Sequence, residues 1–475
     1  MRVARMIALG VLALLPSLAA GQESEPLVQP PDAAPATQEA PLPPPTGPAA
    51  APTPASQPTP ASQPEPEPIP PGETQTPGGM SLAELEELAQ RCNPTLVQAW
   101  ARVQAARGVC LQAGLYPNPV VGYQGTEIGN EGRAGQQGAM FGQELVTAGK
   151  LRLSRAAAAQ QVQQAQYAWQ AQRFRVLTDV RRGFYEALAA ERAVELTEEL
   201  VRIGEQGLNA AEELLKAKEV ARTDVLQARI EADSARILLD KTRNRYAGAW
   251  RSLAAAIGDP SLLPTPLAGS LRDGIPQLTW DDALNRVLAE SPQLAAAQTG
   301  VARARAVLSR ECAGRIPNVE LEAGVQFDNA TGNTIASAGV SVPIPIYDRN
   351  QGNIRRAQAE LTAAQYEVRR VRLALEQRLA AVFEQYATAR QQVDRYASAI
   401  LPNAQESLRL VGAGYRQGEF SYLILLTAQR THFQTNLAYL DALRDLRTSA
   451  AAIEGNLLTD SLQSGEPAEP GPQQP

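Results

Sequence analysis

Histidine, cysteine and methionine carry much of protein catalysis and soft-metal binding, and this chain contains few of them. Its 475 residues include one His, three Cys and four Met. His432 has no second histidine with which to bind a metal, and no neighbouring motif suggests a Ser–His dyad. The cysteines and methionines form no cluster of soft ligands. We therefore expect no catalytic residue, no metal site and no cofactor, and a protein that is not an enzyme.

Two further features have an ordinary structural interpretation. Ala148-Gly149-Lys150 lacks the upstream glycine of a phosphate-binding loop, so we interpret it as the start of a helix. Cys92, Cys110 and Cys312 show no regular spacing; we expect small buried residues, with an isolated disulfide as the alternative. The net charge of −6 argues against nucleic acid as a partner.

The two ends of the chain differ in composition from its middle. Arg2 and Arg5 precede a short apolar run and then small residues, which predicts a secretory signal peptide over 1–21 without a lipid-anchoring cysteine. Residues 22–79 and 459–475 are rich in proline and polar residues, which predicts a disordered tether and tail. No later segment has about 20 consecutive apolar residues, so any membrane-spanning part must consist of strands.

The part between these ends is a duplication. Glu219–Ala228 matches Glu419–Ala428, and other anchors match in the same order about 200 residues apart. We place the first repeat at 80–258, a linker at 259–278 and the second repeat at 279–458.

Each repeat contains two segments whose side chains alternate between apolar and polar. In the second repeat Val319, Leu321, Val325 and Phe327 are the apolar members of one such segment. Alternation over about ten residues suits a strand between lipid and water, and a hairpin packed on a soluble core is the alternative. The predicted strands span about 117–128, 138–146, 318–328 and 334–342.

Very long helices follow the strands. Apolar residues from Ile354 to Ile400 follow a coiled-coil spacing, and the helix is expected to run from Arg349 to Val411, a length of about 95 Å. Pro402 should kink this helix, and Gly412, Gly414 and Gly418 should turn the chain into a returning helix. Four strands cannot close a barrel, so their edges must pair with other subunits. The predicted fold is mainly α with membrane β, a duplicated unit of two strands and a long helical hairpin.

These motifs resemble the TolC-like outer-membrane efflux family. The resemblance rests on the strand entries Tyr116-Pro117-Asn118-Pro119 and Ile316-Pro317-Asn318, and on the hairpin-tip pattern that runs from Tyr415 to Arg430. Pro343–Ile354 is similar to the cobalt–zinc–cadmium resistance branch of that family.

The resemblance implies a homotrimer with a twelve-stranded β-barrel among outer-membrane lipids and a helical barrel in the periplasm. It would be the passive exit duct of a tripartite pump for metal cations or drugs. An inner-membrane transporter of the RND type and a periplasmic adaptor would be its partners. The lipid-facing strand residues would be Val319, Leu321, Val325 and Phe327.

The resemblance also implies where the helical barrel closes and where the adaptor binds. Asp224 would accept a hydrogen bond from Tyr415, and the alternative is that Asp224 caps its own helix. The acidic entrance residues of the family fall on Ile424 and Thr427, which predicts a partly apolar closure. The implied constriction comprises Thr223, Asp224, Tyr415, Phe420, Ile424 and Thr427. The implied adaptor-docking tips comprise Lys218, Glu219, Val220, Gly418, Glu419 and Ser421.

Two other functions remain open at this point. A periplasmic adaptor also has long helical hairpins, but only a single one between compact β-domains. A structural coiled-coil protein of the envelope would not need two strand pairs at matched positions.

Overall fold

The structure is a computed structural model that describes residues 79–463 except 130, 131, 133 and 418. The expected signal peptide lies outside the described residues, as do nearly all of the tether and most of the tail.

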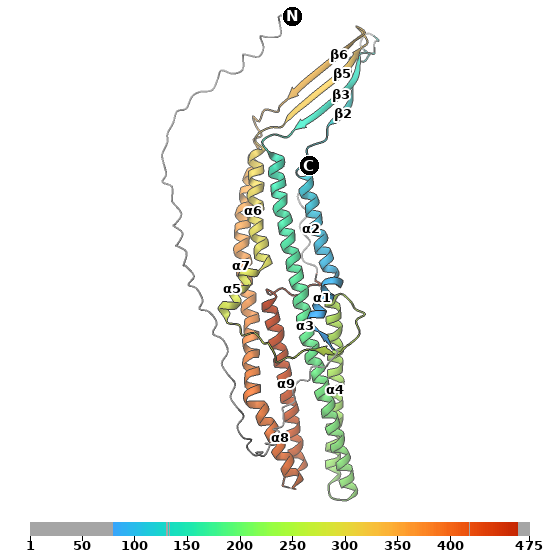
Figure 1. The fold of residues 1–475 in the computed structure, drawn as a ribbon, viewed down its shortest axis with the longest axis vertical. Coiled ribbons are helices and arrows are strands. Elements are labelled where there is room, and N and C mark those ends of the chain that lie inside the picture. Colours follow the sequence, from blue (N-terminus) through green and yellow to red (C-terminus); the bar gives the residue numbers. More distant parts are fainter. Residues whose placement is uncertain (1–78, 130–131, 133, 418, 464–475) are drawn as a thin grey trace, which may run out of the picture. The chain divides into compact units, whose positions relative to one another are not determined.

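The described chain contains the same order of elements twice (Figure 1). Each half has two helices, two strands and a long helical hairpin, and in the second half the first arm of the hairpin is divided into two helices. The first half comprises α1 Leu82–Cys92, α2 Pro94–Gln112, β2 Val120–Thr126, β3 Gln136–Leu145, α3 Lys150–Lys216 and α4 Arg222–Ile257. The second comprises α5 Trp280–Glu290, α6 Pro292–Ala313, β5 Val319–Asp328, β6 Asn333–Ser341, α7 Gln351–Arg395, a π-helical turn Tyr396–Ile400, α8 Leu401–Arg416 and α9 Tyr422–Glu454.

The four strands form one antiparallel sheet in the order β2-β3-β5-β6. The observed β2 is shorter than the expected strand 117–128. Pro117 and Pro119 precede it and have no N–H group to donate to a neighbouring strand. Within the described chain β2 and β6 each have one neighbour, so each leaves one edge unpaired.

Alternation gives the two faces of the sheet different chemistry. Leu321 lies opposite Val340, and Val121 lies opposite Phe141, so these apolar residues share one face. Val319, Leu321, Val325 and Phe327 all lie on that face, and the last three are exposed in the single chain. The other face carries the carboxylates of the four strands, and no strand has a lysine or arginine. These acidic residues are Glu144, Glu320, Glu322 and Asp328.

The long helices leave the sheet and turn back as two hairpins, α3–α4 and α7 to α9 (Figure 1). Helix α3 has 67 residues and begins at Lys150, as expected for Ala148-Gly149-Lys150. Its counterpart is interrupted once, by the π-helical turn immediately before Leu401 and Pro402. Proline removes a backbone hydrogen bond and its ring crowds the preceding turn, which a π turn relieves.

One expectation about the second hairpin is wrong. Gly412 and Gly414 do not turn the chain, because α8 continues to Arg416. At Gly414 the reason for glycine is instead packing. A Cβ atom there would lie 2.4 Å from a ring carbon of Phe420.

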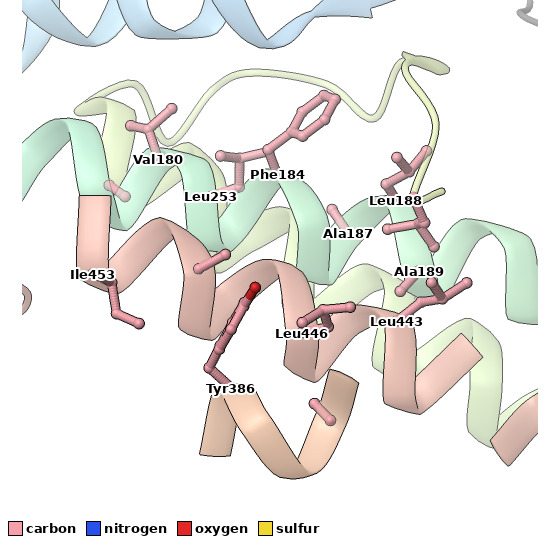
Figure 2. Close-up of a cluster of buried hydrophobic side chains, with 14 of the residues drawn as sticks. Val180, Phe184, Ala187, Leu188, Ala189, Leu253, Tyr386, Leu443, Leu446 and Ile453 are labelled. Carbon is pink, nitrogen blue, oxygen red and sulfur yellow. The ribbon is translucent and has the colours of Figure 1, made fainter. Parts of the chain in front are cut away.

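The core lies where α3, α4, α7 and α9 meet (Figure 2). Phe184 of α3, Leu253 of α4 and Leu446 of α9 are almost completely buried there. The hydroxyl of Tyr386 in α7 donates to Pro276 O at 2.6 Å and accepts from Leu278 N at 3.1 Å. Tyr386 therefore attaches the segment before α5 to the core.

A belt of irregular chain surrounds this core. Its two short strands, β1 Met80–Ser81 and β4 Leu267–Ala268, pair in parallel. The buried guanidinium of Arg447 donates to the carbonyl of Leu271 at 2.9 Å and to that of Gly274 at 3.2 Å, and also to Asp273 O. It also lies 5.1 Å from the centre of the Tyr185 ring. One α9 side chain thus holds residues 270–274 of the loop before α5.

The expectation of buried cysteines is also wrong. Cys92 and Cys312 are exposed, Cys110 is half-buried, and all three are free. In α6 the buried neighbour is Glu311, at 6% exposure, and one residue further along a helix the side chain points about 100° away.

Candidate functional site: the tips of the two helical hairpins

The first hairpin tip joins α3 to α4 through a tight turn. The N–H of Glu219 donates to Leu214 O at 2.9 Å, which closes the end of α3. Lys218 has a φ of 61°, a left-handed conformation that normally favours glycine. The Asp224 carboxylate accepts from Ala221 N at 3.1 Å and so caps the beginning of α4.

The second tip repeats this turn with different side chains. The N–H of Glu419 donates to Gly414 O at 2.9 Å, equivalent to the bond from Glu219. Ser421 occupies the N-cap of α9 but forms no side-chain capping bond. Ile424 stands where the first tip has Asp224, so the second tip lacks the capping carboxylate.

Asp224 and Tyr415 form no recorded hydrogen bond within the described protomer. Asp224 is exposed at the start of α4, where it has the capping role named above as the alternative. Tyr415 is half-buried near the end of α8, and its ring centre lies 6.2 Å from that of Tyr422. Asp224 and Tyr415 thus each contact residues of their own hairpin.

The other residues implied for the constriction are exposed, and two of them, Phe420 and Ile424, are apolar. Phe420 and Ile424 are 39% and 45% exposed. The Thr427 hydroxyl donates to Leu423 O at 2.8 Å, within its own helix. A groove of about 380 Å³ between α8 and α9 includes Ile424 and Thr427 in its lining. Thr223 is exposed on α4, away from this groove.

The residues implied for adaptor docking are accessible in the single chain. Lys218, Glu219, Glu419 and Ser421 are exposed, and Val220 is half-buried. Gly418 lies outside the described residues.

Sequence reasoning did not identify Tyr422 as the residue that joins the two hairpins. Its side chain packs against a small cluster on the first hairpin that contains Ala211, Val225 and Ala228. Its hydroxyl lies so close to Gly207 of α3 that a Cβ there would be 2.8 Å from it. Burial raises the pKa of Tyr422, and nearby Tyr415 and Glu231 raise it further. The only signal in the sequence is that the first repeat has Arg222 at the equivalent position.

A second contact between the hairpins lies further from the tips. Arg430 of α9 forms an ion pair with Glu231 of α4. Beside it is an apolar cavity of about 240 Å³ between α3, α4 and α9, lined in part by Leu238 and Phe433. Near the tips the two hairpins therefore meet through an aromatic contact and this ion pair, and further along Arg245 of α4 pairs with Asp441 of α9.

His432, the single histidine of the sequence, lies in a packed environment. His432 is half-buried against the ring of Phe433, and burial lowers its pKa. Across the described ranges no group of three or more His, Cys, Asp or Glu residues is arranged to hold a metal ion. No helix in the described part of the chain is sufficiently long and apolar to cross a bilayer.

Comparison with known proteins agrees with this architecture. A family model described as outer membrane efflux protein matches residues 85–259 and 283–457. The cobalt-zinc-cadmium resistance protein CzcC of Cupriavidus metallidurans is 27% identical over 380 residues, which are 80% of this chain and 90% of that protein. The cation efflux system protein CusC of Escherichia coli K12 is 24% identical over 280 residues, covering 56% and 60%.

Solved structures share the fold. A crystal structure of CusC has a TM-score of 0.68 at 20% identity and covers 80% of this chain and 92% of that one. The outer-membrane channel OprN has a TM-score of 0.67 at 19% identity, with coverage of 80% and 90%. The family model matches most of the chain, once in each repeat. The chain therefore belongs to the outer membrane efflux protein family and is an outer-membrane component of an efflux system.

Proposed function

We propose that three copies of this chain assemble into a passive duct, with a twelve-stranded barrel in the outer membrane and a helical barrel in the periplasm. The observation that carries the proposal is the four-stranded sheet. Both its outer strands, β2 and β6, leave an edge unpaired, and one of its faces is apolar. Backbone groups in lipid must all be paired, so each edge requires the edge of another copy.

The faces of the sheet support this orientation. The face with Val319, Leu321, Val325 and Phe327 would contact lipid. The opposite face, with four carboxylates and no basic side chain, would line the water-filled interior.

The proposed cargo is metal cations. Glu144 lies opposite Glu320 across β3 and β5, so two carboxylates are side by side on this face. Like charges in that position destabilise a sheet unless a cation lies near them. An acidic interior raises the local concentration of cations. CzcC and CusC, whose names refer to metal resistance and cation efflux, are consistent with this cargo.

The hairpin tips are the proposed contact with a periplasmic adaptor, and through it with an inner-membrane transporter of the RND type. Lys218, Glu219, Val220, Glu419 and Ser421 offer exposed or half-exposed side chains there. The proposed closure of the duct combines a link from Asp224 to Tyr415 of a neighbouring copy with the apolar surface around Ile424 and Phe420.

The experiment that tests this function has two parts. The outer-membrane fraction of a producing strain should contain detergent-resistant trimers, and deletion of the gene should lower tolerance to cobalt, zinc or cadmium. A test variant, Val325→Arg, places a charge on the proposed lipid face and should prevent barrel assembly. A soluble monomer or dimer would contradict the duct and favour an adaptor or a structural coiled coil. Lost tolerance to drugs but not to metals would contradict only the cargo.

A further inference from the structure

A polar pocket of about 490 Å³ lies between α3, α6 and α7, well removed from the hairpin tips. Three arginines line it, Arg175 from α3 and Arg370 and Arg378 from α7. Arg175 Nη1 donates to Gln172 Oε1 at 3.2 Å, and Arg378 Nη2 donates to Gln293 Oε1 at 2.7 Å. Each recorded side-chain acceptor of these two is thus a neutral amide, and within residues 79–463 as described neither Arg175 nor Arg378 has a recorded carboxylate partner.

Arg175 and Arg378 are close enough to affect each other. The side chain of Arg378 stays accessible to solvent, and its partial burial, followed by the positive charge of Arg175, lowers its pKa. The remaining charged residues of the lining do not neutralise them. Arg370 and Glu367 pair with each other through two contacts of 2.6 Å, so the lining keeps an excess of positive charge.

The beginning of α6 adds to the positive potential of the pocket. Its first two residues, Pro292 and Gln293, line the pocket, and the beginning of a 22-residue helix carries partial positive charge. Pro292 itself has no N–H group to donate. Gln164 of α3 reaches Ala296 O of α6 with its amide nitrogen at 3.5 Å, which places its amide group at the same wall. Much of the remaining lining is alanine, which leaves room for a bound group.

We propose that this pocket binds an oxyanion, a carboxylate or phosphate group, between the guanidiniums of Arg175 and Arg378. Planar guanidinium groups match both kinds of oxyanion through paired hydrogen bonds. Bound there, the anion neutralises two like charges that otherwise repel each other, and it bridges α3, α6 and α7. This inference rests on the pocket alone and is independent of the proposed cargo and of the adaptor.

The test uses the full-length protein in detergent. Its thermal midpoint and its binding heat are measured against inorganic phosphate and, separately, N-acetyl-D-alanine as a carboxylate, with sodium chloride at matched ionic strength as reference. We expect saturable binding of at least one probe and a midpoint that rises with it. The probe that binds more tightly identifies the source of the oxyanion as a phosphate or a carboxylate group.

Variants make the test specific. Arg175→Gln with Arg378→Gln should weaken binding by at least about tenfold and should raise the midpoint without a probe, because the repulsion is gone. Arg378→Lys keeps the charge and loses the paired geometry, so it should bind with intermediate affinity. The matched control is Arg355→Gln, an exposed arginine on the same helix, which should bind like the wild type.

Three results would overturn the proposal. One is that neither probe binds beyond the chloride reference. Another is that the double variant binds as tightly as the Arg355→Gln control. The third is that the double variant no longer forms the oligomer of the control, which would assign the arginines to a carboxylate of another copy.

Discussion

The hydroxyl group of Tyr422 lies directly over Gly207, so a helix of the second hairpin rests on a helix of the first at a point without a side chain. Glycine within a helix normally weakens it by roughly 0.5–1 kcal/mol relative to alanine. At Gly207 that cost is offset because no other residue would admit the Tyr422 ring so closely.

The contact between Tyr422 and Gly207 predicts the effect of one methyl group. Gly207→Ala should push the Tyr422 ring aside and loosen the contact between the tips, since the new Cβ would lie 2.8 Å from its oxygen. Because that oxygen is the end of a side chain and alanine favours the helix, stability should change by no more than about 1 kcal/mol. The duct should then admit bulky antibiotics, measured as increased susceptibility of producing cells. Gly412→Ala is the control, because a Cβ there meets nothing within 4 Å and should slightly stabilise α8. Equal behaviour of the two variants would exclude this role for Gly207.

The proposed link between Asp224 and Tyr415 can be separated from helix capping. Tyr415→Phe removes only a hydroxyl group, and Asp224→Asn keeps an oxygen that can accept from Ala221 N. Both variants should leave α4 intact and should raise the conductance of the duct in planar bilayers. If both conduct like the wild type, Asp224 acts only as a helix cap.

A charge at the second tip tests adaptor docking without harming the helix. Ser421 is the N-cap of α9 and forms no capping bond, and aspartate is among the best N-cap residues. Ser421→Asp should therefore stabilise α9 yet abolish cross-linking to the adaptor in cells, while trimers still form. Cross-linking at the wild-type level would remove Ser421 from the docking surface. Gln434→Glu, which places a negative charge at an exposed position further along the same helix, is the control.

Arg447 should be essential to the belt. Arg447→Met leaves the carbonyl groups of Leu271 and Gly274 without their charged donor and should cost about 2–3 kcal/mol of stability. The freed loop should be cleaved by trypsin at Arg272, which mass spectrometry can follow over time. Arg251→Met, an exposed arginine on α4, should leave cleavage unchanged. Similar cleavage in both variants would show that other contacts hold the loop.

His432 predicts a dependence of stability on pH. Burial lowers its pKa below the usual 6.5, and Glu199 partly opposes this. The folded state then binds fewer protons than the unfolded state, so the contribution of His432 is present above pH 6.5 and is lost as the pH falls through the lowered pKa. In thermal unfolding, His432→Gln should lose less stability than the wild type below pH 6.5. A parallel decline of both proteins would refute this.

Periodicity in the sequence predicted most of the long helices, because one buried stripe runs along each of them. The strands followed from alternation, although proline shortened β2 in a way that alternation does not reveal. The pattern did not predict which side of a helix faces outward near its end, and Cys92 and Cys312 were therefore misplaced. The sequence also predicted that Gly414 turns the chain. The residue lies within α8, and glycine is needed there because the ring of Phe420 approaches its Cα.

The candidate site was less accessible to sequence reasoning. The tip residues could be located through the repeat, because the turn at Glu219 recurs at Glu419. Tyr422 and Gly207 are more than two hundred residues apart in the chain, and their contact depends on how the two hairpins pack. No local pattern in the sequence predicts that packing. The contacts of Arg430 with Glu231 and of Arg447 with its loop carbonyls likewise join residues that are far apart in the chain.

The two tips share one backbone turn but differ in side chains, with Asp224 and Arg222 on one and Ile424 and Tyr422 on the other. Three chains would thus present six hairpins in a ring that is sixfold in shape and threefold in chemistry. A partner present in six identical copies would meet two kinds of hairpin tip, which alternate around the ring. Its copies would then bind with two different affinities, and a partner present in three copies would choose one kind.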